Sequence, residues 1–377
     1  MASYDVIIVG LGGMGSATAY HLARRGARIL GLEQFGVAHD RGSSHGKTRV
    51  IRQAYHEGPE YVPLLLRAYD LWHALEREAG TALLTTTGAI YLGTPESPGV
   101  AGAALSARTH DIPYDMLRAE EIRTRYPVLH PRPGHVGLFE HQAGILVPEQ
   151  CVATHIDLAR RRGADLRFDE AVTSWTAGRD RVTVRTTRGS YEGGRLVFTA
   201  GPWTDQVLHD LGLPLRVERV VLYWFEPRAR REEFIRVPIY AWHVDEVNLY
   251  GFPYLEGQGL KVAFHQVFQE ATTPQTIRRD VGEDEVARMR DHLAGVMPDA
   301  PGRLLAAATC MYTNTPDSHF IIDRHPAHAN VALACGFSGH GFKFCSVVGE
   351  VLADLAGRGE TSQPIGLFAL NRFRSVA

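Results

Sequence analysis

Three glycines near the N-terminus could place backbone N–H groups against phosphates. Gly10, Gly12 and Gly15 follow the apolar run of residues 5–9 and precede a helical composition over residues 16–25. In a strand, turn and helix of this kind, glycines permit a tight turn and a close approach by a pyrophosphate. The helix N-terminus adds free N–H groups and a positive dipole. The pattern therefore indicates that the segment binds a dinucleotide.

A carboxylate and a second glycine-rich turn narrow the choice of dinucleotide. Glu33 ends the next apolar run, where it can accept hydrogen bonds from both hydroxyls of an adenosine ribose and would repel a 2′-phosphate. Near the C-terminus, a strand at 330–335, a turn at 336–341 and a helix at 344–356 would bring another helix N-terminus to the cofactor. Its dipole would stabilise negative charge on a reduced isoalloxazine ring. This favours FAD, because a nicotinamide becomes neutral on reduction.

Other reactive residue types carry less information by themselves. Lys261 and His265 are four residues apart, so on a strand their side chains would share one face. The four cysteines have no CxxC spacing, and the long chain does not need a disulfide framework. A lone cysteine is ordinarily a small buried apolar residue. No metal site is expected.

Composition excludes several kinds of partner. The 40 basic and 42 acidic residues give a formal charge of -2, without the basic excess of a nucleic-acid-binding protein. No apolar run approaches the ~20 residues of a membrane-spanning helix, and the N-terminus lacks a targeting pattern. We therefore expect a small-molecule partner, no nucleic acid, no membrane, and a cytoplasmic location.

The elements that must position these residues indicate two interleaved domains. A chain of 377 residues exceeds the roughly 250 to 300 residues over which a single core grows. Strand and helix alternate at both ends and again over residues 148–199. Short strands broken by Gly and Pro fill the two stretches between, the second of which also holds one charged helix over residues 283–293. The fold class expected is α/β plus α+β: a Rossmann-like FAD-binding domain interleaved with a catalytic domain on an antiparallel sheet. The predicted FAD-binding segments are 1–85, 145–215 and 310–377, and the predicted catalytic segments are 86–144 and 216–309.

Several longer motifs, in one collinear order, carry a family resemblance. They are Gly42–Arg52, Glu60–Pro63, Tyr250–Pro253, Gly259–Lys261, Cys310–Thr313, His319–Asp323 and Gly336–Lys343. With these motifs the sequence resembles the monomeric sarcosine oxidase and N-methyltryptophan oxidase family of FAD-dependent amine oxidases. The likeness runs from residue 5 to about residue 350.

The resemblance implies roles for individual residues. It implies a covalent FAD on the thioether of Cys310 and a carboxylate clamp made by Arg52 and Lys343. It places Lys261 over the flavin ring, where a fixed cation stabilises the charge that develops as O2 is reduced. The remaining residues implied to line the pocket or contact the cofactor are His265, Tyr250, Tyr312, Arg49, His45, Gly339 and Gly341.

The sequence departs from the family at a few positions. Gly201–Trp203 carries a proline where the relatives have alanine, Lys47 replaces an acid, and Ser44 replaces a histidine. Tyr240–His243 matches poorly, and Ala241 would leave room in a strand expected to line the substrate pocket. The substrate is therefore the element that the resemblance defines least.

The activity expected is oxidation of a small secondary amino acid by a monomeric enzyme. A hydride would pass to FAD, and reoxidation by O2 would yield an imine and hydrogen peroxide. The alternatives are an oxidase of a cyclic imino acid such as proline or pipecolate, or of a specialised metabolite, and a dehydrogenase with an acceptor other than oxygen. A flavin-binding protein without turnover is the alternative from a different class.

Overall fold

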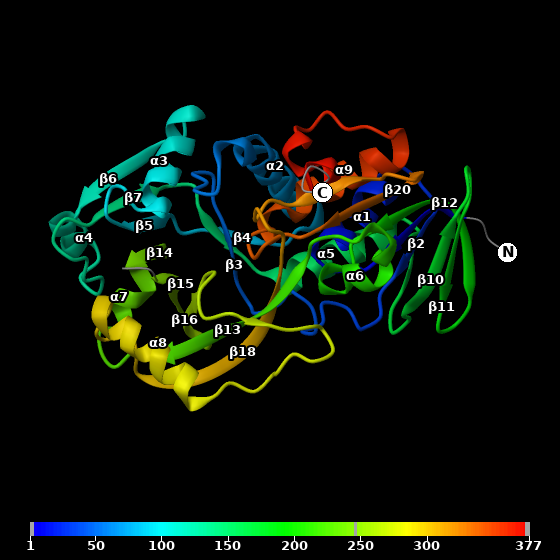
Figure 1. The fold of residues 1–377 in the computed structure, drawn as a ribbon. Coiled ribbons are helices and arrows are strands. Elements are labelled where there is room, and N and C mark those ends of the chain that lie inside the picture. Colours follow the sequence, from blue (N-terminus) through cyan, green and yellow to red (C-terminus); the bar gives the residue numbers. More distant parts are fainter. Residues whose placement is uncertain (1–3, 245–246, 374–377) are drawn as a thin grey trace.

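The computed structural model describes residues 4–244 and 247–373, which form two lobes (Figure 1). One lobe is built on a mainly parallel sheet with the order β10-β11-β12-β1-β2-β9, extended by β20 beside β12 and by β19 beside β20. Its strands are β1 (Tyr4–Val9), β2 (Ile29–Leu32), β9 (Asp165–Arg167), β10 (Val172–Ala177), β11 (Val182–Thr186), β12 (Ser190–Phe198), β19 (Ile321–His325) and β20 (His328–Cys335). β1 pairs in parallel with β2 and β12, as expected for a doubly wound sheet.

Helices cover this sheet because each presents an apolar stripe to it. α1 (Gly13–Arg24) packs against α5 (Pro148–Arg161) and α9 (Cys345–Arg358), and α2 (Val62–Ala79) packs against α9. Gly26, one residue beyond the C-cap of α1, and Gly80, at the C-cap of α2, take positive φ, which lets the chain turn away where each helix ends. The short helices are α6 (Thr204–Val207), η1 (Pro59–Tyr61), η2 (Gly201–Trp203), η3 (His209–Leu211), η4 (Phe342–Phe344), η5 (Gly366–Phe368) and η6 (Leu370–Phe373).

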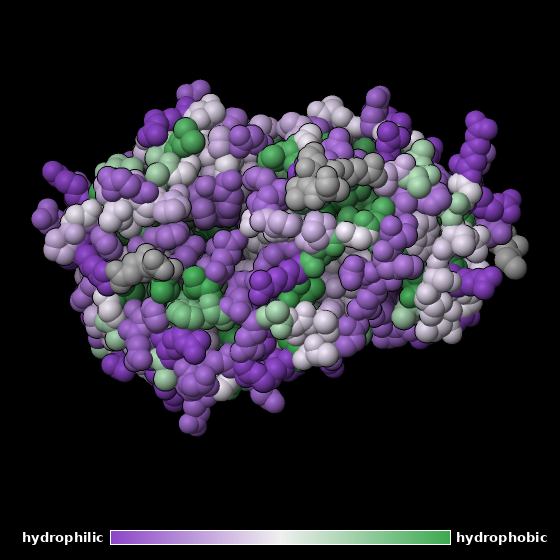
Figure 2. Space-filling model, viewed as in Figure 1, coloured by the Kyte–Doolittle hydropathy of each residue, from purple (hydrophilic) through white to green (hydrophobic). Residues whose placement is uncertain are grey.

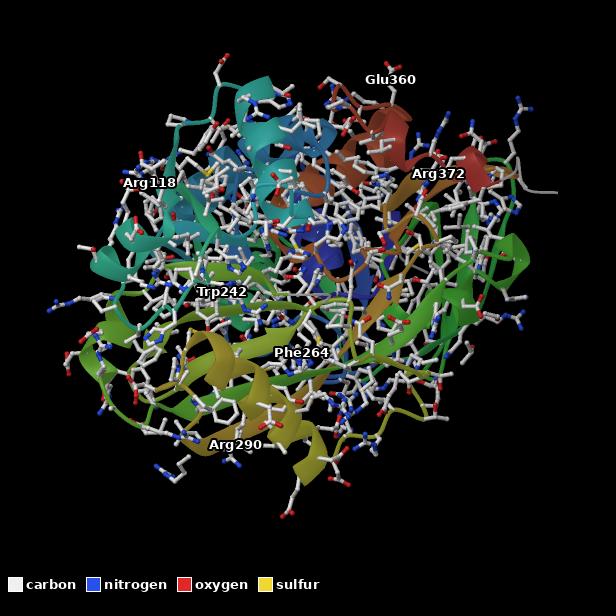
Figure 3. All side chains as sticks on the ribbon, turned by 60° about the vertical axis from the view of Figure 1, so that its left-hand side comes forward. Arg118, Trp242, Phe264, Arg290, Glu360 and Arg372 are labelled. Atoms are coloured by element: carbon white, nitrogen blue, oxygen red, sulfur yellow. The ribbon has the colours of Figure 1, made fainter. Side chains whose placement is uncertain are left out.

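The other lobe is built on a mainly antiparallel sheet with the order β17-β13-β16-β15-β14-β5-β7-β6, in which β18 also pairs with β13. Its strands are β5 (Ala89–Gly93), β6 (Tyr114–Arg118), β7 (Val136–Glu140), β13 (Arg216–Glu226), β14 (Ile239–Val244), β15 (Val247–Leu255), β16 (Gly259–Phe264), β17 (Glu270–Ala271) and β18 (Arg303–Asn314). α8 (Glu283–Val296) packs its apolar residues on the face that carries Trp242 and Phe264 (Figure 3). β3 (Arg49–Ile51), β8 (Gly144–Leu146) and β4 (Leu84–Thr86) form a small third sheet.

The fold class predicted from the sequence is confirmed, while some details differ. α3 (Pro98–Thr109), α4 (Ala119–Arg125) and α7 (Arg231–Arg236) are helices that the sequence did not indicate, whereas α8 confirms the charged helix expected over residues 283–293. The proposed domain boundaries stay a prediction. The boundary placed after residue 309 falls inside β18, which pairs with β13 along its length.

Among the described residues, no helix combines the length and apolarity needed to cross a bilayer. Figure 2 shows hydrophilic side chains over most of one face, with small apolar patches between them.

We expect two glycines of α9 to respond in opposite ways to substitution by alanine. A Cβ on Gly349 would lie 2.5 Å from Cβ of Ala17, whereas one on Gly357 would meet nothing within 4 Å. Gly349→Ala should lower the free energy of unfolding by ~1–3 kcal/mol through overpacking. Gly357→Ala should raise it by up to ~1 kcal/mol through helix propensity. Urea unfolding checks both, and changes of the same sign would contradict the close packing of α1 and α9.

Candidate active site

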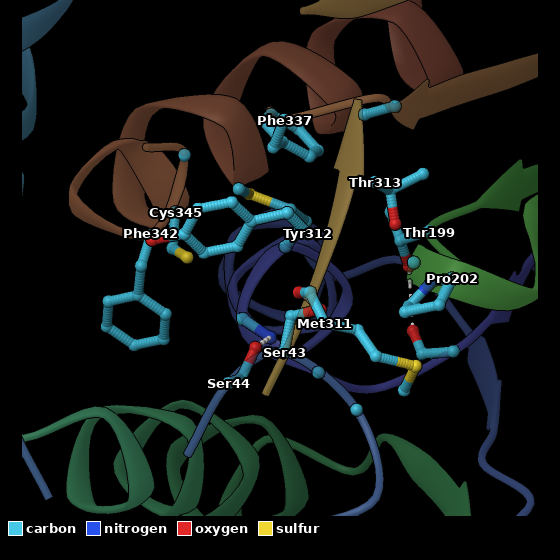
Figure 4. Close-up of a pocket in the computed structure, with 18 of the residues that line it drawn as sticks. Ser43, Ser44, Thr199, Pro202, Met311, Tyr312, Thr313, Phe337, Phe342 and Cys345 are labelled. Carbon is cyan, nitrogen blue, oxygen red and sulfur yellow. Dashed lines mark hydrogen bonds between the residues drawn. The ribbon is translucent and has the colours of Figure 1, made fainter. Parts of the chain in front are cut away.

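A cavity of about 860 Å³ is lined by residues from both lobes. One part is bordered by the loop after β1, the end of β2 and the segment after β12, and another by the face of the second sheet that includes β15 and β18. Figure 4 shows Met311 of β18 beside Ser43 of the loop before β3, and Ser43 Oγ donates to the carbonyl oxygen of Met311 at 2.8 Å. The volume is within the ~300–1,000 Å³ range of small-molecule and cofactor sites.

The glycine turn after β1 is packed as a phosphate-binding turn must be. Gly10 has φ +89°, and a Cβ on it would lie 2.6 Å from the carbonyl oxygen of Thr199. A Cβ on Gly15 would lie 1.8 Å from the oxygen of Gly10, so the helix and the turn touch backbone to backbone. Gly12 instead lines the cavity and has only Ser44 Oγ near its Cβ position, at 3.5 Å. The turn is closed on the protein side and open toward the cavity.

Glu33 is held in place by backbone donors at the end of β2. Its Oε2 accepts from the N–H of Leu11 at 2.9 Å, and its Oε1 accepts from the N–H of Phe35 at 3.1 Å. A carboxylate oxygen can accept more than one hydrogen bond, so capacity remains for ribose hydroxyls. Together with the open Gly12 backbone, this arrangement fits an adenine dinucleotide.

Cys310 lies in an electropositive pocket on β18. Arg49 Nη2 is 3.6 Å from Cys310 Sγ, and His45 is the neighbour that most favours the thiolate. Burial alone would raise the pKa of this thiol, but His45 and Arg49 outweigh burial and lower the pKa to about 6. The other cysteines are buried, and burial raises their pKa. Cys310 is therefore the cysteine whose thiolate forms near neutral pH.

Arg52 and Lys343, far apart in sequence, converge on the ring of Tyr55. The Arg52 guanidinium carbon is 4.7 Å from the ring centroid, and Lys343 Nζ is 5.0 Å from it. Lys343 Nζ also donates to the carbonyl oxygen of His340 at 2.7 Å. Burial, with Arg52 nearby, lowers the pKa of Lys343 to about 7. Both cations line the cavity, where they form a site for an anionic group.

The aromatic and histidine residues named from the sequence also line the cavity. His265 Nδ1 is 3.5 Å from the hydroxyl of Tyr312, and the ring of Tyr250 packs edge-on against His265. Burial lowers the pKa of His265 to about 4, so the imidazole is neutral at physiological pH. A Cβ on Gly339 would lie 2.4 Å from the Tyr312 ring, and one on Gly341 would lie 2.5 Å from Phe337. Both glycines are needed for this close packing.

Three of the predicted residues lie behind the cavity wall. Gly15, His45 and Lys261 are not among the lining residues. Lys261 Nζ instead donates to the oxygen of Gly46 at 2.6 Å and to both Thr48 O and Thr48 Oγ1 at 3.0 Å. Burial lowers the pKa of Lys261 below its usual range, while these three acceptors stabilise its charged form.

Three residues near Arg52 were not predicted from the sequence. His56 and Glu57 line the cavity and bind the guanidinium directly, at 2.6 Å and 2.5 Å. Glu140 is fully buried and accepts hydrogen bonds from the backbone N–H of Gln53 at 2.6 Å and from that of Ala54 at 3.0 Å. Loop residues and a buried acid have no periodicity that would reveal them. Their proximity to the predicted Arg52 in sequence was the one available signal for His56 and Glu57.

Comparisons with known proteins agree with this geometry. Residues 5–355 match the model of the family described as FAD dependent oxidoreductase. The chain is 52% identical to monomeric sarcosine oxidase of Streptomyces avermitilis, over 99% of both chains. It is 35% identical to N-methyl-L-tryptophan oxidase of Citrobacter koseri, over 98% of this chain and 99% of that one.

A solved structure shows the same architecture. NikD, an unusual amino acid oxidase essential for nikkomycin biosynthesis, superimposes with a TM-score of 0.85 at 25% identity. The superposition covers 98% of each chain, so both lobes correspond.

The thiol of Cys310 should titrate near pH 6. In flavin-free protein, produced under riboflavin depletion, labelling of Cys310 by iodoacetamide should rise with pH through a midpoint of about 6, because the thiolate is the nucleophile. His45→Asn should raise the midpoint. Cys335, whose pKa burial raises to about 12, serves as an unlabelled internal control in peptide mass mapping. A midpoint for Cys310 near the ordinary ~8.5 would contradict the assigned environment.

Proposed function

This chain belongs to the FAD dependent oxidoreductase family, and we propose that within it the chain oxidises small N-methyl amino acids of the sarcosine type. The observation that carries the proposal is the pairing of Arg52 and Lys343 on Tyr55, in the same cavity as Cys310 and the glycine turn. A binding protein would not need a carboxylate site and a cofactor site that share one cavity.

Arg52 and Lys343 hold the substrate carboxylate in this scheme. A guanidinium binds a carboxylate through two parallel hydrogen bonds, and the lysine fixes the orientation from a second direction. Both cations are fully buried or nearly so, with exposed fractions of 7% and 4%, so solvent weakens their attraction little. The carboxylate thereby determines which carbon of the substrate faces the cofactor.

The same residues favour the reactive, neutral form of the substrate amine. An ammonium has no lone pair to drive hydride loss, and two nearby cations disfavour it electrostatically. His265, kept neutral by burial, can accept a hydrogen bond from the amine N–H without adding positive charge. No general base of raised pKa is required.

Glu33 and the glycine turn would hold FAD, which would supply acceptance of a hydride from the carbon next to the amine nitrogen and transfer of the electrons to O2. The imine product is hydrolysed by water, and the oxygen reaction gives hydrogen peroxide. Lys261 contributes a fixed charge from behind the cavity wall, where it holds Gly46 and Thr48 in place.

The environment of Cys310 supports covalent attachment of the cofactor. A thiolate stabilised by Arg49 and His45 would be the nucleophile for a thioether link to a flavin carbon. That carbon would lose a C–H proton, and the two electrons released would pass to the oxidised flavin and from it to O2. The protein would act as a monomer, since one chain supplies residues from both lobes to the cavity and one relative is named monomeric sarcosine oxidase. A cytoplasmic location is part of the same proposal.

Sarcosine should bleach the flavin of the purified protein under anaerobic conditions and, in air, yield one peroxide per amine consumed. Arg52→Gln and Lys343→Met should each raise KM for sarcosine by ~10-fold or more, because a charge-assisted hydrogen bond is lost. Dimethylamine, which has no carboxylate, is the matched control and should be unaffected. Dye reduction without peroxide would identify a dehydrogenase, and no bleaching by any secondary amine would contradict the proposal.

Acid precipitation tests the covalent link directly. Yellow colour should stay in the pellet of the wild-type protein and move to the supernatant for Cys310→Ala. Cys345→Ala, which changes another cysteine of the cavity lining, should keep the colour in the pellet. Release of the flavin from the wild-type protein would remove the assignment.

A further inference from the structure

Most donors of Arg52 are held by neighbouring protein groups. A guanidinium has five N–H bonds. Nη1 contacts His56 Nδ1 at 2.6 Å and donates to the hydroxyl of Tyr91 at 3.3 Å, while Nη2 donates to Glu57 Oε1 at 2.5 Å. Nε is buried and has no partner among the described residues. Nε–H and the second N–H of Nη2 therefore have no acceptor among these contacts, and the residue as a whole lines the cavity.

His56 must be the acceptor in its contact with Arg52, because arginine can only donate. The imidazole is then neutral, with its proton on Nε2. Burial lowers the pKa of His56 well below its usual range, which preserves this form, although Glu57 acts in the opposite direction. Glu57 Oε2 is 3.5 Å from His56 Nδ1, so both acceptors lie on the same side of the guanidinium.

The backbone around His56 is fixed from several sides. Ser106 Oγ donates to the carbonyl oxygen of Tyr55 at 2.5 Å, and Tyr91 Oη donates to that of Ala54 at 2.7 Å. A Cβ on Gly102 of α3 would lie 2.5 Å from the carbonyl oxygen of His56, so the helix packs directly on this loop. The ring also packs edge-on against Tyr91, with centroids 6.0 Å apart.

We propose that His56 is a positioning residue that holds Nη1 of Arg52 and so fixes the orientation of the guanidinium that binds the substrate carboxylate. This inference rests on the proposed function, in which Arg52 binds that carboxylate. In this scheme His56 contacts neither the substrate carbon that loses the hydride nor the flavin that accepts it. Its contribution is therefore to the affinity for the carboxylate. Tyr91 and the Tyr55 ring restrict the same guanidinium, but neither supplies a nitrogen acceptor.

A pair of nearly isosteric variants tests the proposal in the flavin-bound protein. Asparagine can place Oδ1 where His56 has Nδ1, whereas leucine fills similar space without an acceptor. His56→Leu should raise KM for sarcosine by ~10-fold or more with kcat little changed, and His56→Asn should stay near wild type. Acetate supplies a second readout: its Kd, measured from the flavin absorption spectrum, should rise in parallel for His56→Leu.

The outcomes separate this proposal from the function on which it rests. If sarcosine is not oxidised but acetate binds, the proposed substrate fails while the acetate Kd still decides the role of His56. Equal behaviour of the Leu and Asn variants, whether both unchanged or both impaired, overturns the proposal. His56→Ala replaces the Leu variant if that protein loses flavin or melts early. If the Asn variant alone folds, His56 is structural and the proposal is again overturned.

Discussion

The burial of several positive charges around one cavity is the constraint on which the rest of this structure depends. A buried cation is costly unless acceptors surround it. Lys261 is surrounded by oxygens of Gly46 and Thr48, Lys343 uses the carbonyl of His340, and Arg49 donates to the carbonyls of Thr48 and Ser43. Most of these acceptors are backbone groups, so the cations determine the path of the loops. Gly46, at φ +100°, lets the chain turn tightly beside Lys261.

The residues that remain neutral are equally important for the chemistry. His265 and His340 lie among these cations, and burial lowers the pKa of each, to about 4 and about 3. Protonating them would add charge to a region that already holds Arg52 and Lys343. The cavity therefore combines fixed cations for an anionic group with imidazoles that accept or donate hydrogen bonds. That combination suits an amino acid whose nitrogen must react without its extra proton.

The sequence predicted the parts of the site that depend on local backbone geometry or on long collinear motifs. Gly10 and Gly12 of the glycine turn, Glu33, Cys310, Arg52 and Lys343 line the cavity, whereas Gly15 does not. Lys261 was expected over the flavin ring. The acceptors that surround its Nζ belong to a loop distant in sequence, and the periodicity of a strand cannot reveal such partners. His56 and Glu57 were missed for a similar reason, since only the folded loop brings them to Arg52. α3 and α4 were missed because their short apolar patterns are interrupted by glycine or charged residues.

The order in which the cavity walls occur along the chain has a consequence for biosynthesis. The glycine turn is made before β18, the turn with Gly339 and Gly341, and Lys343. α9 then packs on α1, nearly the full length of the polypeptide away. The complete cavity consequently requires β18 to have been made, and a nascent chain stalled before β18 would carry the glycine turn without that wall of the cavity.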